Sequence, residues 1–397
     1  MKTKMKVKIS PVAQKREVII VGDVEMGGGT ITDDFIADAR FSTLILGFAT
    51  QNIPVDLILN GDTFDFLKCP YVVNGIRTYP RHITAQISLS KLEQMYLSHT
   101  RVFEALSVFV KKKENRLYFI IGNHDPDLVF SQVQRKIRNL LKNKDKTRDS
   151  IHFTFRYDQF GVYVEHGHQH DFLNKVNKKK LFLDFKGERI LNIPWVSFSL
   201  ISNFMTMKEE HPFSERIKPW PLMFSHHRVV VHKLNKRSFE YLFKCFLYYP
   251  LRYFRDPTYW VPTELFREIY RRFKDTHWDV DEVMAVFQRK QRWKRIETHQ
   301  IHVLGHIHRW YVEEHAGRVF IHPDTWRDEY IFEEETRLLK PKDKRYVKVS
   351  LENGRISDWQ MVEVPNIRKN LHFDEVIKDE KGWLRKAAHD EGYELKL

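Results

Sequence analysis

Five short segments of the chain carry carboxylate, carboxamide and imidazole side chains directly after an apolar run. They are Asp23-Val24-Glu25, Asp62-Thr63-Phe64-Asp65, Asn123-His124-Asp125, His166-Gly167-His168 and His306-Ile307-His308. These groups are common ligands of divalent cations, and a set of this size could hold two of them. A glycine next to or within each segment lets the backbone turn sharply and a phosphate approach closely. A single Gly-Asp or His-x-His pair is usually structural, but five in this order favour a metal centre.

The apolar runs before these segments are typical of buried strands. The predicted strands are Glu17–Val21, Val55–Leu59, Leu117–Ile121, Gly161–Glu165 and His302–Leu304, with closing strands at Arg318–Ile321 and Arg345–Val349. Ile83–Lys112 has the apolar spacing of a helix. Buried strands that alternate with helices predict an α/β fold. Because the loops beyond the carboxyl ends of such strands converge on one crevice, the five segments should meet there.

The composition predicts a folded, basic protein. Of 397 residues, 66 are Lys or Arg and 52 are Asp or Glu, which gives a net charge of +14. The 42% of hydrophobic residues suffice for a core and exclude wholesale disorder. Two cysteines, Cys69 and Cys245, exclude a disulfide framework and fit a reducing compartment. We find neither a signal peptide nor a membrane-spanning stretch, and we expect a cytoplasmic protein.

The region 172–300 differs from the rest of the chain. It holds 25 Lys and Arg against 14 Asp and Glu, together with 25 aromatic residues. We interpret it as helices inserted between the fourth and fifth core strands, and call it the cap. Its charge favours phosphates, nucleic acid or an acidic membrane surface. Aromatic and basic residues together suit peripheral contact with an anionic membrane, a groove for an amphiphilic phosphate, or simply the core of a helical subdomain.

The order of the five segments resembles that of the calcineurin-like metallophosphoesterase superfamily. Its motifs are Asp-x-His, Gly-Asp-x-x-Asp, Gly-Asn-His-Asp, His-Gly and Gly-His-x-His, and the match spans Glu17 to about Trp326. The resemblance implies a four-layer α/β/β/α sandwich with an inserted helical cap. Residues 17–171 and 301–365 would form its two parts, and 366–397 a charged tail with a helix over Asp374–Ala388. Ile321–Arg327 is similar to the closing strand of that family, with Asp324 where glycine is usual.

Carried over position by position, the resemblance implies a dinuclear centre in which Asp62 bridges two divalent cations. The other implied ligands are Asp23 and His308 for the first cation, and Asn123, His166 and His306 for the second. Hydroxide between the cations would attack phosphorus in line with the leaving oxygen. His124 would donate a proton or stabilise the transition state, and Asp65 and Asp125 would orient it and the ligands.

Glu25 stands where the family has histidine. We expect it to be a ligand of the first cation. The added carboxylate favours Mn²⁺ or Mg²⁺ over Fe or Zn²⁺, with Mn²⁺ preferred. The alternative is that Glu25 points away and that the first cation binds weakly.

The predicted activity is hydrolysis of a phosphate ester or pyrophosphate, on a phosphorylated small molecule or lipid. The UDP-diacylglucosamine pyrophosphohydrolases of that superfamily also insert a helical cap, and this resemblance implies an amphiphilic substrate similar to UDP-diacylglucosamine. Two alternatives stay open: a DNA or RNA nuclease of the same superfamily, and a catalytically weakened metal-binding scaffold.

Overall fold

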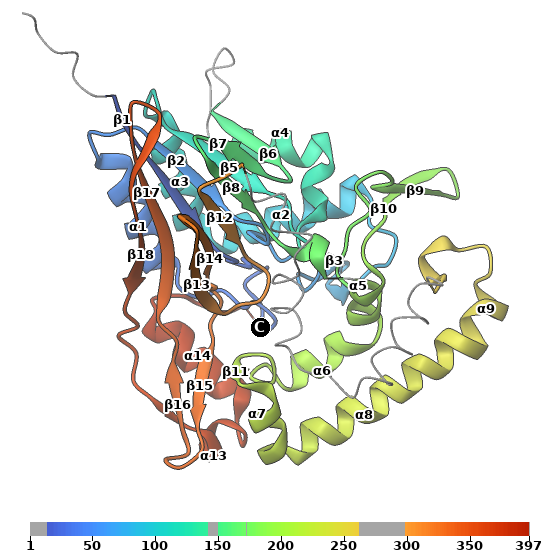
Figure 1. Ribbon diagram of the computed structural model, residues 1–397. Coiled ribbons are helices and arrows are strands. Elements are labelled where there is room, and N and C mark those ends of the chain that lie inside the picture. Colours follow the sequence, from blue (N-terminus) through green and yellow to red (C-terminus); the bar gives the residue numbers. More distant parts are fainter. Residues whose placement is uncertain (1–13, 142–149, 172, 262–297, 397) are drawn as a thin grey trace, which may run out of the picture.

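The computed structural model describes residues 14–141, 150–171, 173–261 and 298–396, and these form a mixed α/β fold (Figure 1). The larger sheet has the strand order β18-β17-β1-β2-β5-β6. Its strands are β1 (Lys15–Val21), β2 (Val55–Leu59), β5 (Arg116–Ile120), β6 (Ile151–Thr154), β17 (Lys344–Glu352) and β18 (Arg355–Val364). The strands β1, β2, β5 and β6 are parallel, whereas β17 and β18 pair antiparallel.

A second sheet has the order β13-β14-β12-β8-β7. Its strands are β7 (Tyr157–Gln159), β8 (Val162–Glu165), β12 (Ile301–Leu304), β13 (Trp310–His315) and β14 (Arg318–Pro323). The strand β12 pairs parallel with both β8 and β14. The sheet therefore joins strands from either side of the cap.

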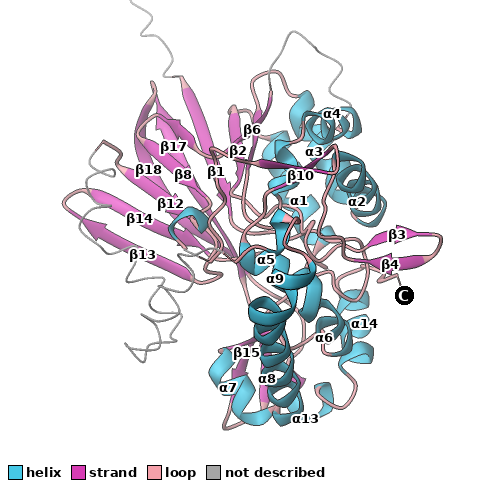
Figure 2. Ribbon diagram, turned by 90° about the vertical axis from the view of Figure 1, so that its right-hand side faces the viewer, coloured by secondary structure: helices cyan, strands magenta, loops and turns pink. Residues whose placement is uncertain are grey.

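Alternation along β1 shows how the layers pack. Val18 and Ile20 lie in a buried cluster with Val164 and Val303 of the second sheet, so the two sheets face each other. Ile19 and Val21, which alternate with them along β1, point the other way. They pack in a cluster with the helices α1 (Asp38–Thr50), α2 (Ala85–Ser98), α3 (Thr100–Lys111) and α4 (Ser131–Leu140). Figure 2 shows these helices together on one side of the larger sheet.

The predicted strands are confirmed, each to within a few residues. The predicted helix Ile83–Lys112 is instead two helices, because the backbone at His99 (φ −114°, ψ 33°) ends α2 and starts α3. Helix α1 and the hairpin of β3 (Tyr71–Val73) and β4 (Ile76–Thr78) have no counterpart in the sequence prediction.

The described part of the cap begins with a hairpin and continues as helices. The hairpin is β9 (Phe182–Phe185) and β10 (Glu188–Leu191). The helical elements are α5 (Trp195–Ser199), the π-helical turn η3 (Leu200–Phe204), α6 (Met205–Glu210), α7 (Trp220–His226), α8 (Arg228–Phe243), the π-helical turn η4 (Lys244–Tyr248) and α9 (Tyr249–Arg252). Residues 172 and 262–297 of the predicted cap lie outside the described residues.

The segment predicted as a charged tail is packed against the rest of the protein. A small sheet has the order β11-β15-β16-β19, with strands β11 (Ile217–Lys218), β15 (Tyr330–Glu333), β16 (Leu338–Pro341) and β19 (Leu371–His372). Phe373, Val376 and Leu384 are buried in one cluster with Ile217 of the cap. The expected helix Asp374–Ala388 is two helices, α13 (Phe373–Val376) and α14 (Glu380–Asp390), because the Asp379 side chain caps α14 by accepting from the Gly382 amide.

No helix among the described residues combines the length and the apolar character that a bilayer crossing requires.

Candidate metal centre

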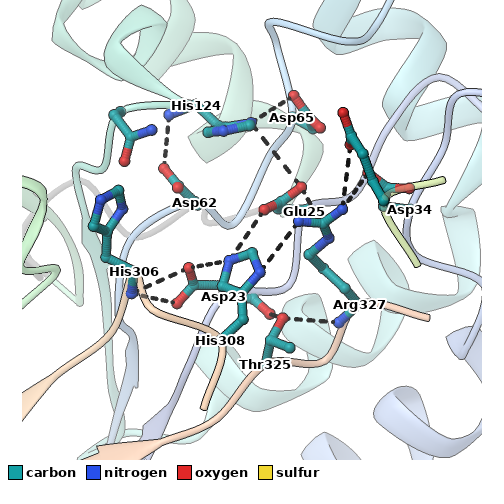
Figure 3. Close-up of polar contacts among 12 residues, drawn as sticks. Asp23, Glu25, Asp34, Asp62, Asp65, His124, His306, His308, Thr325 and Arg327 are labelled. Carbon is teal, nitrogen blue, oxygen red and sulfur yellow. Dashed lines mark hydrogen bonds and ion pairs between the residues drawn. The ribbon is translucent and has the colours of Figure 1, made fainter. Parts of the chain in front are cut away.

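The five segments meet beyond the carboxyl ends of β1, β2, β5, β8 and β12, as the topology predicts (Figure 3). The backbone amides of Val24 and Glu25 both donate to the carbonyl of Asp62, at 3.2 and 2.7 Å, and so fasten the first two loops together. Glu25, Asp62, His306 and His308 all have positive φ, from 46° to 76°. Non-glycine residues in this region are uncommon and concentrate at functional sites.

Two glycines are required by this close packing. A Cβ atom on Gly122 would lie 2.0 Å from Asp62 Oδ1, and one on Gly61 would lie 2.4 Å from the His166 ring. Both positions therefore exclude any larger residue. Asp324, where glycine was usual in the compared motif, has φ 77°, and its carbonyl oxygen fills the space where Gly22 would carry a Cβ.

Asp23, Glu25 and His308 form the first group of candidate ligands. His308 Nε2 lies 2.9 Å from Asp23 Oδ2 and 3.4 Å from Glu25 Oε1. Both carboxylates are fully buried. Glu25 Oε1 accepts no hydrogen bond from any described residue. A buried carboxylate oxygen beside an imidazole nitrogen and a second carboxylate fits a cation site.

Asp62, His166 and His306 form the second group, with ligand atoms within 4.8 Å of one another. His166 Nε2 lies 3.0 Å from Asp62 Oδ2 and 3.1 Å from Asn123 Oδ1. Asn123 therefore joins this group. Asp62 also belongs to a set with Glu25 and His124, so it lies between the two groups.

Each imidazole of the two groups is fixed through one of its nitrogens. His166 Nδ1 donates to the carbonyl of Asn60 at 2.9 Å, His306 Nε2 lies 3.1 Å from Asp171 Oδ2, and His308 Nδ1 lies 3.4 Å from Glu329 Oε1. Such contacts fix the ring orientation and leave the second nitrogen for a cation.

The electrostatics of the second group suit a cation. Burial opposes the charged form of Asp62, but His166 and His124 outweigh it and hold the pKa of that carboxyl well below its usual range. Burial likewise lowers the pKa of His166, but Asp62 and Asp23 raise it to about 10. In this arrangement, protons on the histidines balance the buried carboxylates, and a divalent cation could take their place.

A buried ionic network lies beside the first group, and the sequence did not indicate it. Lys68 Nζ donates to Glu25 Oε2 at 2.8 Å and to Asp34 Oδ2 at 2.6 Å. Arg327 contacts the same two carboxylates, at 3.4 and 2.9 Å. The network around Asp34 includes four cations and four anions, namely Lys68, Lys208, Arg216 and Arg327 with Glu25, Asp34, Asp65 and Glu215. Arg216 extends it to Asp328 at 3.0 Å.

This network keeps Glu25 charged. Burial alone would raise the pKa of Glu25, but Arg327 and Lys68 lower it to about 2. The two cations contact Oε2, whereas Oε1 faces His308. Glu25 therefore does not point away from the first group. Because its charge is already shared with Lys68 and Arg327, it attracts a cation less strongly than an unpaired carboxylate would.

His124 lies at the edge of the site, with 17% of its side chain exposed. Its Nδ1 is 3.0 Å from Asp65 Oδ1, which leaves Nε2 for a bound molecule. Asp65, Glu25 and Asp62 outweigh the effect of burial and raise the pKa of His124 to about 9. The contact with Asp65 thus fixes the orientation of the His124 ring.

Asp125 has a different role from His124, because it is fully buried. It accepts from the amides of Gly122 and Thr63, at 2.7 and 2.8 Å. Burial and the charge of Asp62 raise its pKa to about 8. Asp125 therefore holds together the loops that carry Asn123 and Asp62, and it does not reach the open part of the site.

Neither a scan against models of known protein families nor a search of curated proteins finds a match to this chain. The function is therefore inferred from the side chains and their geometry.

Proposed function

We propose that this protein is a metal-dependent phosphoric ester hydrolase of the calcineurin-like type, with a four-layer α/β/β/α core. The observation that carries the proposal is the pair of ligand groups, Asp23–Glu25–His308 and Asp62–His166–His306, joined through Asp62. Supporting it, the two facing sheets and the helices α1 to α4 supply three layers in the required order.

The chemistry depends on residues that hold charge at fixed places. Two divalent cations bound here would supply Lewis acidity and a hydroxide at neutral pH, with Mn²⁺ favoured by the oxygen-rich first group. Asp62 holds the two groups at a constant separation. His124, oriented by Asp65, donates a hydrogen bond or a proton to an oxygen of the substrate. No nucleophile from the chain is required.

The decisive experiment compares the wild type with Asp62→Asn. The purified chain is stripped with a chelator, reloaded with Mn²⁺ and assayed with bis-p-nitrophenyl phosphate. We expect metal-dependent hydrolysis by the wild type, and loss of turnover together with metal from both sites in the variant. Asp184→Asn, at the exposed position of the hairpin strand β9, is the matched control and should behave as wild type. Full turnover by Asp62→Asn after reloading would refute the dinuclear assignment.

The weakened scaffold is the second candidate function, and one observation favours it. Lys68 and Arg327 neutralise part of the negative charge that the first cation needs. If the chain binds one cation tightly and does not hydrolyse the ester at any Mn²⁺ concentration, the scaffold is the better description.

A further inference from the structure

The elements α8, η4 and α9 follow one another without a break from Arg228 to Arg252, the long yellow-green helix at the lower right of Figure 1. One face of this helix is buried through Tyr241, Cys245 and Tyr249, at intervals of four residues. Tyr241 packs on Trp195 and Tyr249 on Tyr259, with ring centroids 5.4 and 4.7 Å apart. This face attaches the helix to the rest of the cap.

The other face of the same helix exposes large apolar side chains. Phe239 is 74% exposed and Leu251 is 82% exposed. The exposed apolar side chains of the helix from Phe239 onward are Phe239, Leu242, Phe243, Phe246, Leu247, Tyr248 and Leu251. Their spacing of three and four residues places most of them on one stripe. A surface helix normally exposes polar residues opposite its buried face, so this stripe requires an explanation.

Two further rings just beyond the end of α9 are also exposed, namely Phe254 at 60% and Trp260 at 64%. Cations occur along the same stretch of the chain, and Arg228, Lys236, Arg252 and Arg255 are exposed. Residues 228–261 contain seven Lys or Arg and two Asp or Glu. Arg252 and Arg255 lie over the rings of Tyr253 and Phe254, at 5.8 and 5.2 Å from the centroids.

We propose that the exposed stripe of α8 and α9 binds the surface of a lipid bilayer that contains anionic lipids. An apolar helix face flanked by Lys, Arg and aromatic rings lies in the plane of such an interface, with the rings at headgroup depth and the cations near the lipid phosphates. The buried face holds the helix to the protein, so the whole molecule would be carried to the bilayer.

Two other binding partners, single-stranded nucleic acid and a second copy of this chain, fit the stripe less well. Single-stranded nucleic acid binds through stacking on aromatic rings, but Leu242, Leu247 and Leu251 offer no ring. A second copy of the same face would bring like charges together, because residues 228–261 carry seven Lys or Arg against two Asp or Glu. An anionic bilayer provides both the hydrocarbon and the opposite charge.

The first test is flotation of the full chain with vesicles of phosphatidylcholine, with or without phosphatidylglycerol. We expect binding to the anionic vesicles at low salt. The variant Leu247→Glu/Leu251→Glu should reduce the partition coefficient by about tenfold or more, because it removes two side chains from the hydrocarbon and adds two repelled charges. Leu97→Glu/Ile367→Glu is the matched control, since both residues are more than half exposed and lie outside the cap, in α2 and in the loop after β18. It should bind as wild type.

The second test separates the charge from the apolar contact. Lys236→Gln/Arg252→Gln should weaken binding to the anionic vesicles. The binding that is left should depend less on salt concentration than that of the wild type. Arg101→Gln/Lys113→Gln removes two exposed cations from another part of the surface and should change neither property.

Several results would overturn the proposal. One is that the wild type does not float with anionic vesicles at low salt, and another is that the stripe variant and its control bind equally. Self-association in sedimentation velocity that Leu247→Glu/Leu251→Glu abolishes, without vesicle binding, would assign the stripe to a second copy. Binding of mixed-sequence single-stranded DNA alone would assign it to nucleic acid. None of these readouts depends on hydrolysis, so the proposed function is tested separately.

Discussion

Glu25 ends in two oxygens that face different surroundings. Oε2 accepts from Lys68 at 2.8 Å, whereas Oε1 accepts no hydrogen bond from the described residues and lies 3.4 Å from His308 Nε2. A histidine at this position could offer one nitrogen to a cation but no charge to Lys68 and Arg327. Lys68 and Arg327 therefore keep the buried Glu25 ionised, and Glu25 in turn balances part of their buried charge.

Because these charges balance one another, substitutions of Glu25 and Lys68 should have non-additive effects on the free energy of unfolding. Glu25→His should lower the free energy of unfolding by about 3–5 kcal/mol, because it leaves Lys68 and Arg327 short of a buried partner. Glu25→His/Lys68→Met should recover part of that loss, since Asp34 keeps three other cations. Urea unfolding of the four proteins of the cycle measures the coupling.

Metal content provides an independent check on Glu25. Glu25→Ala should lose one of two Mn²⁺ ions, measured by elemental analysis after gel filtration. If both ions stay, Glu25 is not a ligand, and the network has a purely structural role.

His124 should behave differently from the ligands. Removing its imidazole with His124→Ala should lower turnover of a phosphodiester by about 10²- to 10⁴-fold, the usual contribution of a general acid. The metal content should stay at wild-type level. His372→Ala, at an exposed histidine, is the control. Because His124 also lies near Glu25 and Asp62, loss of metal in His124→Ala would instead identify it as a ligand.

At the scale of elements, the strands that carry the site were predictable and the network beside it was not. The strands β1, β2, β5, β8 and β12 are short apolar runs, each followed by a glycine within two residues, and this pattern is visible in the local sequence alone. Helix α1 was missed because Ala37, at its start, provides no side-chain cap. Lys68 and Lys208 look like surface residues in the sequence, because their partners Asp34 and Glu215 come from other loops.

The cap is held to the C-terminal helix α14 through Glu380. Its Oε1 lies 2.7 Å from His211 Nδ1 and 3.2 Å from His227 Nε2, and its Oε2 accepts from the amide of Phe213 at 2.8 Å. Burial alone would raise the pKa of Glu380, but these contacts lower it. The stability that it adds is therefore present above its unfolded pKa, near 4.3, and is lost as the pH falls through the lowered value.

Substitution of Glu380 should loosen this junction. Glu380→Gln keeps the shape but removes the charge, and we expect the free energy of unfolding to fall by about 1.5–3 kcal/mol at neutral pH. Glu375→Gln, exposed in the adjacent helix α13, should change it by less than about 0.5 kcal/mol. Equal urea midpoints for the two variants would show that the contact contributes nothing to stability.

At the scale of the whole molecule, His99 links the two ends of the chain. It is fully buried between Asp33 and Asp38, at 3.0 Å from each, and stacks on Tyr393 with ring centroids 5.1 Å apart. Burial opposes its charge, but the two carboxylates raise the pKa of His99 to about 10. The Tyr393 hydroxyl donates to Asp33 at 3.1 Å and completes the cluster.

The raised pKa of His99 determines how the free energy of unfolding changes with pH. The folded protein keeps a proton on His99 that the unfolded chain releases near pH 6.5. The added stability is therefore complete below pH 6.5 and is lost as the pH rises towards 10, with a slope of up to about 1.4 kcal/mol per pH unit. His99→Asn should lack this slope, so its stability curve should not run parallel to that of the wild type, whereas His372→Asn should keep the slope. Parallel stability curves for wild type and His99→Asn between pH 7 and 10 would contradict the assignment.

The place of β1 in the larger sheet has a consequence for synthesis. It pairs with β2 on one side and with β17 on the other, although β17 comes from the far end of the chain. While the ribosome adds the residues before 344, one edge of β1 has no native partner and offers unpaired amides and carbonyls to other nascent chains. The central sheet therefore cannot be completed in the order of translation, because β1 must wait for β17, which is synthesised after β2, β5 and β6.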